Sequence, residues 1–239
     1  MFDSLKSQFI LNFIEDDRWK YLTNGLVNTL KITFVSVILG IAIGVIIAIV
    51  RSTWDKNGDD MRPGVGKFFL KLANGFCKLY LTVIRGTPVV VQLMIIYYII
   101  FAASNNGVGI AMLAFGINSG AYVAEIIRGG IMSIDAGQFE AGRSLGLNYT
   151  QTMRHIIIPQ AFKNVLPALA NEFIVLLKET SVAGYVSVQD LTKGGDIIRG
   201  RTYSAFMPLI AVALIYLILV IFFTWLVGKL ERRLRSSDH

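Results

Sequence analysis

Four polar side chains stand inside otherwise apolar stretches, and their types can bind the charged groups of a polar solute. Asn118, Ser119 and Tyr122 lie close together in the sequence, and each carries a hydrogen-bond donor suited to a carboxylate. Glu172 lies about 12 residues into a predicted helix over 160–181, near its middle, and can accept hydrogen bonds from an ammonium group. Ionisable groups within membrane spans usually face a cavity or a partner. These residues are candidates for a substrate path through the predicted spans, and hydrogen bonds between helices are the alternative interpretation.

A second polar pair, Glu125 and Arg128, is three residues apart on one predicted helix and can pair locally as a structural or gate pair. The sequence offers little other chemistry. It has one cysteine and two histidines, no Ser–His pair, and no glycine-rich phosphate loop ending in Gly-Lys-Ser. We therefore expect no catalytic residue, no metal site and no ATP hydrolysis by this chain alone.

Apolar helices must position these groups. The chain of 239 residues is 54% hydrophobic and 16% charged, against about 25% charged in soluble domains. Charge-free runs such as 32–50 can cross a hydrocarbon core of about 30 Å. We predict an all-α membrane protein with about five transmembrane helices, after an amphipathic interfacial segment over 1–21. The expected spans are 22–50, 67–103 with a break at Pro88, 108–131, 160–181 and 205–227, and a polar stretch over 184–204 precedes the last.

Small residues in the first span predict a tight helix contact. Gly40 and Gly44 form a GxxxG pattern, which lets another helix approach closely. Small residues that merely tolerate lipid are the alternative.

Basic residues set the predicted orientation, because cytoplasmic loops carry an excess of lysine and arginine. Five spans place the termini on opposite sides. Lysine and arginine are frequent over 51–78, over 128–163 and in the tail from Lys229. We expect the N-terminus outside and the C-terminus in the cytoplasm, with 184–204 outside despite its three basic residues.

A polar segment over 135–158 predicts two short helices on the cytoplasmic side. The first ends at Gly146, since glycine readily takes the left-handed conformation of a helix cap. Asn148 can cap the second helix, with Gln151 three residues on. Pro159 then opens the fourth span. Such a rigid knob, joined to a membrane helix, can pass force from a cytoplasmic partner into the membrane.

This segment resembles the EAA motif of binding-protein-dependent ABC importer permeases. Glu140-Ala141-Gly142 is followed by Gly146, Ile156 and Ile158-Pro159 at the spacing of that motif, with Gly142 in place of the second alanine and Ile158 in place of leucine. The stretches "IRGTPVVVQL", "NSGAYVAEIIRGGI" and "NEFIVLLKETS" are similar to the polar amino acid branch of the family.

The resemblance covers most of the chain and implies a permease domain over 22–235 in a bacterial cell membrane. It implies a coupling site at Glu140, Ala141, Gly142, Arg143, Gly146 and Pro159. The implied partners are two ATPase subunits that bind ATP and Mg²⁺, a second permease copy or paralogue, an extracellular or periplasmic amino acid-binding protein and membrane lipid. No nucleic acid is expected. The implied function is import of polar or charged amino acids.

An ion-coupled secondary amino acid transporter is the alternative function. Such a protein needs its own ion-coupling site and usually internal repeats. The chain shows no repeat, and five spans do not divide into equal halves.

Overall fold

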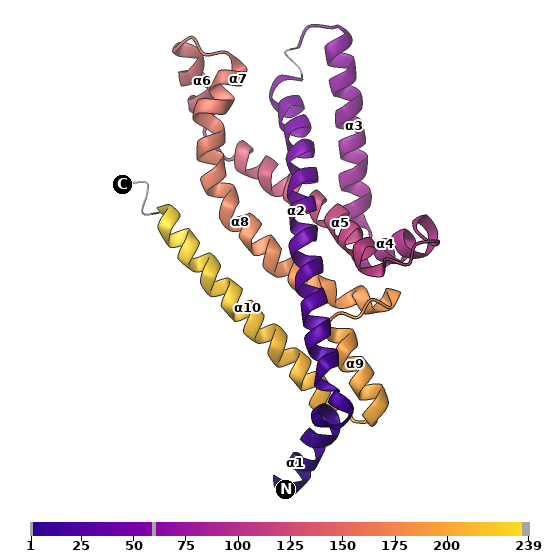
Figure 1. The fold of residues 1–239 in the computed structure, drawn as a ribbon. Helices are drawn as coiled ribbons and strands as arrows, with labels where there is room; N and C mark the ends of the chain where they lie inside the picture. Colours follow the sequence, from indigo (N-terminus) through magenta and orange to yellow (C-terminus); the bar gives the residue numbers. More distant parts are fainter. Residues whose placement is uncertain (1, 59–60, 236–239) are drawn as a thin grey trace. The chain divides into compact units, whose positions relative to one another are not determined.

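The computed structural model describes residues 2–58 and 61–235, and helices make up most of that part of the chain (Figure 1). No strand occurs among the described residues, so the predicted all-α class is confirmed. The α-helices are α1 (Phe2–Phe9), α2 (Trp19–Asn57), α3 (Val65–Gly86), α4 (Val89–Ile95), α5 (Gly107–Met132), α6 (Ala136–Ser144), α7 (Tyr149–Thr152), α8 (Ile158–Glu179), α9 (Leu191–Thr202) and α10 (Phe206–Arg235).

The helices α2, α5 and α10 are long and apolar enough to cross a membrane. The helix α3 and the following Val89–Ile100 meet the same condition only together, as a broken pair. Pro88 explains the break, because it has no N–H and holds Thr87 extended, at φ −126° and ψ 148°. The helix α8 has 22 residues, four of them charged, and is not among the apolar helices. The count of five spans, which needs α8, stays a prediction.

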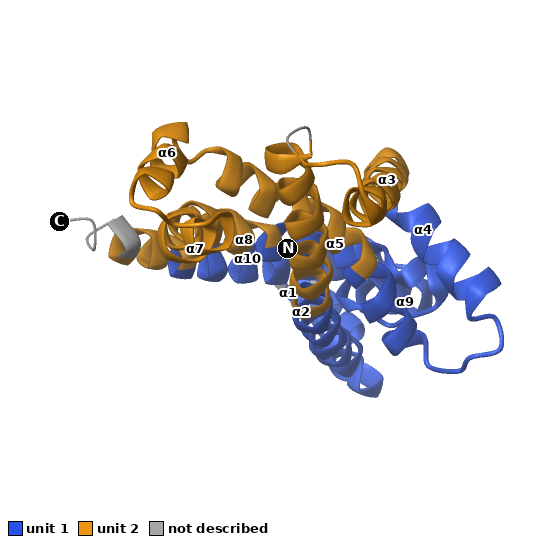
Figure 2. Cartoon of the chain, turned by 90° about the horizontal axis from the view of Figure 1, so that it is seen from above, with its two compact units in different colours: residues 1–37, 88–116, 173–226 blue, residues 38–87, 117–172, 227–239 orange. Residues whose placement is uncertain are grey.

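The chain forms two compact units (Figure 2). Unit 1 comprises residues 1–37, 88–116 and 173–226, and unit 2 comprises 38–87, 117–172 and 227–239. The predicted site residues all belong to unit 2. The boundaries between the units fall inside α2, α5, α8 and α10, and between α3 and α4.

In unit 2, α2 and α5 pack closely at the two glycines of the GxxxG pattern. A Cβ atom on Gly40 would lie 2.9 Å from the Ser119 Oγ, and one on Gly44 would lie 2.5 Å from the Val123 Cγ1. Neither distance is compatible with a side chain, so the predicted close approach is confirmed. A small apolar cluster beside it joins α2, α3 and α5 through Ile47, Leu81, Ala121 and Ala124.

In unit 1, the polar stretch predicted over 184–204 contains the helix α9. Asp190 starts this helix by accepting hydrogen bonds from the backbone N–H groups of Thr192 (2.9 Å) and Lys193 (3.1 Å). Leu191 and Ile198 are buried in a cluster with Phe13, Leu22 and Val212. The helix forms because one capping carboxylate precedes apolar residues at helical spacing, a signal that glycines and charges obscure in the sequence.

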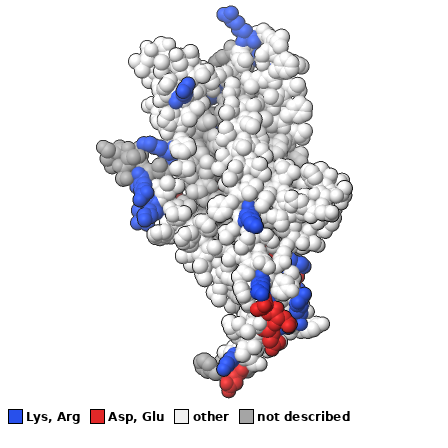
Figure 3. Space-filling view, in the orientation of Figure 1, with Lys and Arg blue, Asp and Glu red and all other residues white. Residues whose placement is uncertain are grey.

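The N-terminal region of unit 1 is helical but interrupted. After α1 come a π-helical turn over Ile10–Ile14 and a short turn where Asp16 and Asp17 have positive φ values of 53° and 55°. Lys20 donates a hydrogen bond of 2.6 Å to Asp17 and thereby holds the pKa of that carboxyl below its usual value. Acidic side chains on the face shown in Figure 3 gather in this region, around α1.

Candidate functional site

Residues 135–152 form a hairpin of the helices α6 and α7, which we call the coupling hairpin because it carries most of the predicted coupling site. Hydrogen bonds to backbone groups at each helix end shape it. Asp135 caps α6 by accepting a hydrogen bond of 2.7 Å from the Gly137 N–H. Gly146 has φ +78° and directs the chain out of the helix, as predicted. The Leu147 N–H then donates to the Gly142 carbonyl at 3.0 Å. The first hairpin helix is confirmed.

The second hairpin helix, α7, begins with the predicted capping box. The Gln151 N–H donates to the Asn148 side chain at 3.0 Å, and the Asn148 N–H donates to the Gln151 side chain at 2.9 Å. It continues through a π-helical turn, Met153–Ile157, into α8, whereas the sequence predicts a fresh start at Pro159. Proline supplies no N–H, and the wider turn just before it lets the helix run on with a different hydrogen-bond register.

The coupling hairpin exposes most of the residues that the motif singles out. Glu140, Ala141, Arg143 and Gly146 are exposed, as is Pro159 at the start of α8. The opposite side of the hairpin is anchored by an apolar cluster of Ile131, Ile134, Phe139, Ile157 and Ala161. The buried apolar cluster therefore holds the hairpin in place, while the exposed side of the hairpin presents polar groups to its surroundings.

Gly142 is the exception, because it is buried against Thr152. A Cβ atom on Gly142 would lie 2.6 Å from the Thr152 Cγ2 and 2.7 Å from its Oγ1. The alanine of the usual motif does not fit beside this threonine. The sequence therefore departs from the motif at Gly142 where the structure has no space for an alanine. The space is taken by Thr152, ten residues later on the other helix of the hairpin.

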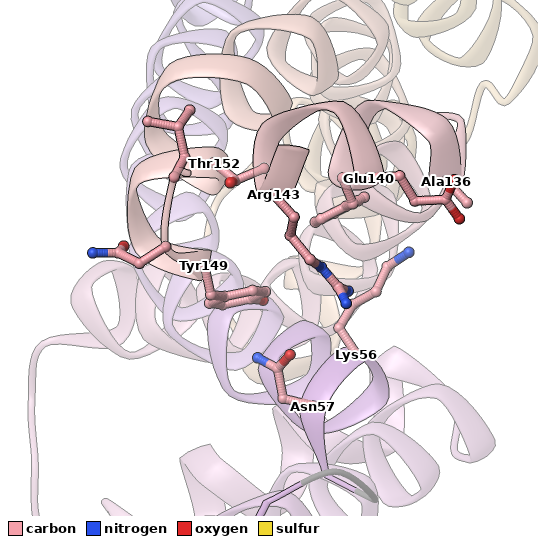
Figure 4. A pocket seen from close by; sticks show the side chains of 10 residues that line it. Lys56, Asn57, Ala136, Glu140, Arg143, Tyr149 and Thr152 are labelled. Carbon is pink, nitrogen blue, oxygen red and sulfur yellow. The ribbon is translucent and has the colours of Figure 1, made fainter. Parts of the chain in front are cut away.

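A cavity of about 440 Å³ lies between the coupling hairpin and the end of α2 (Figure 4). Its lining includes Lys56 and Asn57 from α2 and Glu140, Arg143 and Tyr149 from the hairpin. Burial raises the pKa of Tyr149 above its usual value, while side-chain hydrogen bonds to Thr53 and Asn57 lower it. These bonds tie the hairpin to α2, a contact that the sequence does not predict.

Deeper in unit 2, the structure joins two of the four candidate path residues. The Ser119 hydroxyl donates a hydrogen bond of 3.0 Å to the Glu172 carboxylate, which links α5 to α8. Ser119 is fully buried, and Glu172 is 9% exposed. Gly40 makes room for this contact, since its missing Cβ would meet the Ser119 Oγ.

The other two candidates lie on the same helix with different surroundings. Asn118 is buried, with 2% of its surface exposed, and Tyr122 is 36% exposed. The Arg85 guanidinium lies over the Tyr122 ring at 5.9 Å, so a cation borders this aromatic face. Ser119 and Glu172 are thus joined in the interior, Asn118 is buried on the same helix as Ser119, and Tyr122 is exposed.

Glu125 and Arg128 pair as predicted, at 3.0 Å, but they belong to a larger network. Arg85 of α3 lies 3.8 Å from Glu125, and Asp55 of α2 lies 3.5 Å from Arg128. Arg51 lies 3.5 Å from Asp55. Three helices thus meet through three arginines and two carboxylates. Sequence spacing can show the pairs within one helix, Glu125 with Arg128 and Arg51 with Asp55, but not the contacts between helices, whose partners are far apart in the chain.

Residues 65–236 match the family described as "Binding-protein-dependent transport system inner membrane component". The chain is 37% identical over 221 residues to the arginine transport system permease protein ArtQ of Bacillus subtilis (strain 168), covering 91% of this chain and 94% of that protein. It is 39% identical over 168 residues to the glutamine transport system permease protein GlnP of Escherichia coli (strain K12), covering 69% and 77%.

Two solved structures share the fold. A structure described as an amino acid ABC transporter with histidines matches at a TM-score of 0.78 and 41% identity, over 90% of this chain and 94% of that one. The MetNI methionine ABC transporter in an inward-facing conformation matches at a TM-score of 0.76 and 22% identity, over 92% and 99%. The match over residues 65–236 and the relatives above 30% identity show that this chain belongs to the inner membrane components of binding-protein-dependent transport systems, the permeases of ABC importers.

Proposed function

We propose that this permease carries polar or charged amino acids, delivered by a solute-binding protein, across the inner membrane. The named relatives support this substrate class, since one is an arginine and the other a glutamine permease. The work of ATP hydrolysis is done by separate ATPase subunits, which bind ATP and Mg²⁺. An ion-coupled transporter does not fit the family to which the chain belongs.

The observation that carries the proposal is the geometry of the coupling hairpin. Its exposed edge displays Glu140, Ala141 and Arg143, and its base is buried with Phe139. A knob of this kind seats in a groove of an ATPase and moves as one body with α8. Gly146 shapes the turn between its two helices, Pro159 follows it at the start of α8, and Gly142 lets the two helices pack closely.

For the substrate path, the support comes from the buried polar group around Ser119 and Glu172. Glu172 would accept hydrogen bonds from the ammonium of the amino acid, and Asn118 and Tyr122 would donate to its carboxylate. The Ser119 hydroxyl occupies one of the roughly four acceptor positions of the Glu172 carboxylate, at 3.0 Å. The network of Glu125 and Arg128 would act beside it as a gate or as a brace.

The proposed assembly holds two ATPase subunits, a second permease copy or paralogue, and a binding protein on the outer side. The permease domain covers 22–235 with five spans, and residues 1–21 lie at the membrane interface among lipid. The N-terminus would be outside and the C-terminus in the cytoplasm, as the basic residues of the loops indicate.

Uptake by reconstituted vesicles tests the proposal. Vesicles holding the permease, its ATPase and its binding protein should import radiolabelled arginine or glutamine when ATP is inside. Vanadate should stop uptake, and an ionophore that collapses ion gradients should leave it unchanged. Gradient-driven uptake without the ATPase would refute the proposal.

A further inference from the structure

We propose that Arg85, near the end of α3, binds the carboxylate of the amino acid that this permease moves. The inference rests on the proposed transport function and supplies a charge that the candidate path lacks. A free amino acid carries an ammonium and a carboxylate, whereas the candidate path residues comprise one anion, Glu172, and neutral donors. A carboxylate that leaves water without a cation beside it is costly, so a positive charge is needed near the path.

Packing of α3 against α5 brings Arg85 to the path. Leu81 of α3 is buried together with Ala121 and Ala124 of α5. One turn after Leu81, the Arg85 guanidinium lies 5.9 Å from the centre of the Tyr122 ring. The packing of the two helices therefore fixes which side chain of α5 the arginine meets.

Tyr122 in turn lies close to the buried Ser119–Glu172 pair along α5. It follows Ser119 by three residues, which places it about 4.5 Å further along the helix axis and on the same side of the helix. Ser119 donates a hydrogen bond of 3.0 Å to Glu172. The guanidinium and the carboxylate therefore lie beside neighbouring turns of α5, as the two charged ends of a small zwitterion require.

The charge of Arg85 is only partly balanced within the chain. In the part of the chain that the structure describes, its one carboxylate within ion-pairing distance is Glu125, at 3.8 Å. The same Glu125 oxygen already accepts a hydrogen bond of 3.0 Å from Arg128. Arginine hydrogen bonds to carboxylates are about 2.7–2.9 Å long, so Arg85 forms none with Glu125. Its planar fork of N–H donors, which matches a carboxylate, remains available to a ligand.

The surroundings of Arg85 leave room for a ligand. The Arg85 side chain is 46% exposed, and it precedes the break after α3 in the stretch that is apolar enough to cross a membrane only as a broken pair. A Cβ atom on Gly86 would meet nothing within 4 Å, and Thr87 is extended and exposed. Non-helical backbone that is not buried in protein occurs at membrane depth only where it lines a water-filled cavity. An arginine at such a place can receive an anion that arrives through the water.

Equilibrium binding to the purified complex of permease and ATPase, without the binding protein, tests the proposal. The probes are an imported amino acid and the amine left when its carboxyl group is removed: arginine with agmatine, or glutamine with γ-aminobutyramide. The unaltered complex should bind the amino acid about tenfold or more tightly than the amine, because only the amino acid forms the charged hydrogen bond. Arg85→Gln should weaken amino acid binding by about that factor and leave amine binding unchanged, so the preference should disappear.

Two further variants separate ligand binding from a structural effect. Arg85→Lys keeps a cation beside Glu125 but loses the planar fork, so it should retain the fold and show an intermediate preference. The matched control is Lys78→Gln, which removes an exposed cation two turns earlier on the same face of α3 and should leave both affinities unchanged.

Equal weakening of the amino acid and the amine by Arg85→Gln would mean that Arg85 only supports Glu125, and would overturn the proposal. An unchanged preference in Arg85→Gln, or no saturable amino acid binding to the unaltered complex, would also overturn it. Vesicle uptake distinguishes this failure from failure of the transport function. Normal uptake with an unchanged preference removes Arg85 alone, whereas no uptake of any amino acid removes the transport function together with this inference.

Discussion

The coupling hairpin and the buried Ser119–Glu172 pair belong to the same unit, yet different forces hold them in place. The hairpin is shaped by its own backbone: capping groups at Asp135 and Asn148 and a left-handed glycine at 146. The Ser119–Glu172 pair is fixed by the packing of α5 against α8 and by the space that Gly40 leaves. An exposed element can thus be specified within twenty residues, whereas a buried polar site needs partners from distant parts of the chain.

The buried pair should show the largest functional effect when its charge is removed. Glu172→Gln preserves shape and an oxygen for Ser119, so the fold should survive. Losing hydrogen bonds to a charged group should lower amino acid uptake roughly 10- to 100-fold, with basal ATP hydrolysis nearly intact. Vesicle uptake and ATPase assays on the same preparation measure both quantities.

Ser119→Ala is the matched control for this prediction, because it removes the protein donor and leaves the charge. Its effect on uptake should be smaller. A complex that fails to assemble with Glu172→Gln would assign Glu172 a structural role. Unchanged uptake across a panel of amino acids would remove it from the path.

The hairpin should respond to a change of backbone preference rather than of charge. At φ +78°, a β-branched residue in place of Gly146 is strained by about 1–2 kcal/mol, which corresponds to a factor of roughly 5–30. Gly146→Val should therefore lower the number of substrate molecules moved per ATP by about that factor, while the membrane helices stay folded. Gly146→Asn, which tolerates this conformation, should retain coupling. A normal ratio for the valine variant would contradict the coupling assignment.

Sequence reasoning succeeds where the decisive contacts are local. The residue types of Gly146, Asn148 and Gln151 predict the backbone conformation at their own positions. The spacing of Glu125 and Arg128 predicts their ion pair. It fails where the partner is remote. Asp55 and Arg85 complete the charge network from other helices, and Thr152 faces Gly142 across the hairpin turn. Local sequence patterns do not show which distant residues come into contact.

The remote contact at Gly142 should affect the local stability of the hairpin rather than transport. Gly142→Ala places a Cβ atom 2.6 Å from Thr152, and overpacking of this kind costs about 1–3 kcal/mol. Local opening of the hairpin should increase accordingly, so the Leu147 amide, bonded to the Gly142 carbonyl, should exchange its hydrogen faster. Adding Thr152→Ala removes the clash and should restore protection. Equal exchange in the single and double variants would show that the two residues do not interact.

Asp190 combines the two kinds of site, since it is a capping group and also a buried carboxylate. Burial raises its pKa above the usual value, although the N–H groups of Thr192 and Lys193 lower it in part. An acid with a raised folded pKa contributes stability that is present at low pH and lost as the pH rises through that pKa. Asp190→Asn keeps the capping oxygen but removes the titrating carboxyl. The melting temperature of this variant should therefore vary less with pH, between about 4 and 8, than that of the unaltered protein.

The expected change for Asp190→Asn is the smallest of the series, below about 1 kcal/mol. Asp190→Ala is the control, because it removes the cap as well and should cost about 1 kcal/mol at every pH. An unaltered pH profile in the asparagine variant would mean that the carboxyl does not titrate differently in the folded protein.

The contact between Gly142 and Thr152 also bears on how such hairpins can be exchanged between transporters. A chimera that received only α6 from a permease with alanine at the position of Gly142 would place the alanine methyl group against Thr152, where there is no space for it. A chimera that received 136–152 as one piece would carry both halves of the contact. The hairpin should therefore be transferred as a whole. A substitution at position 142 or 152 restricts which residues are tolerated at the other position.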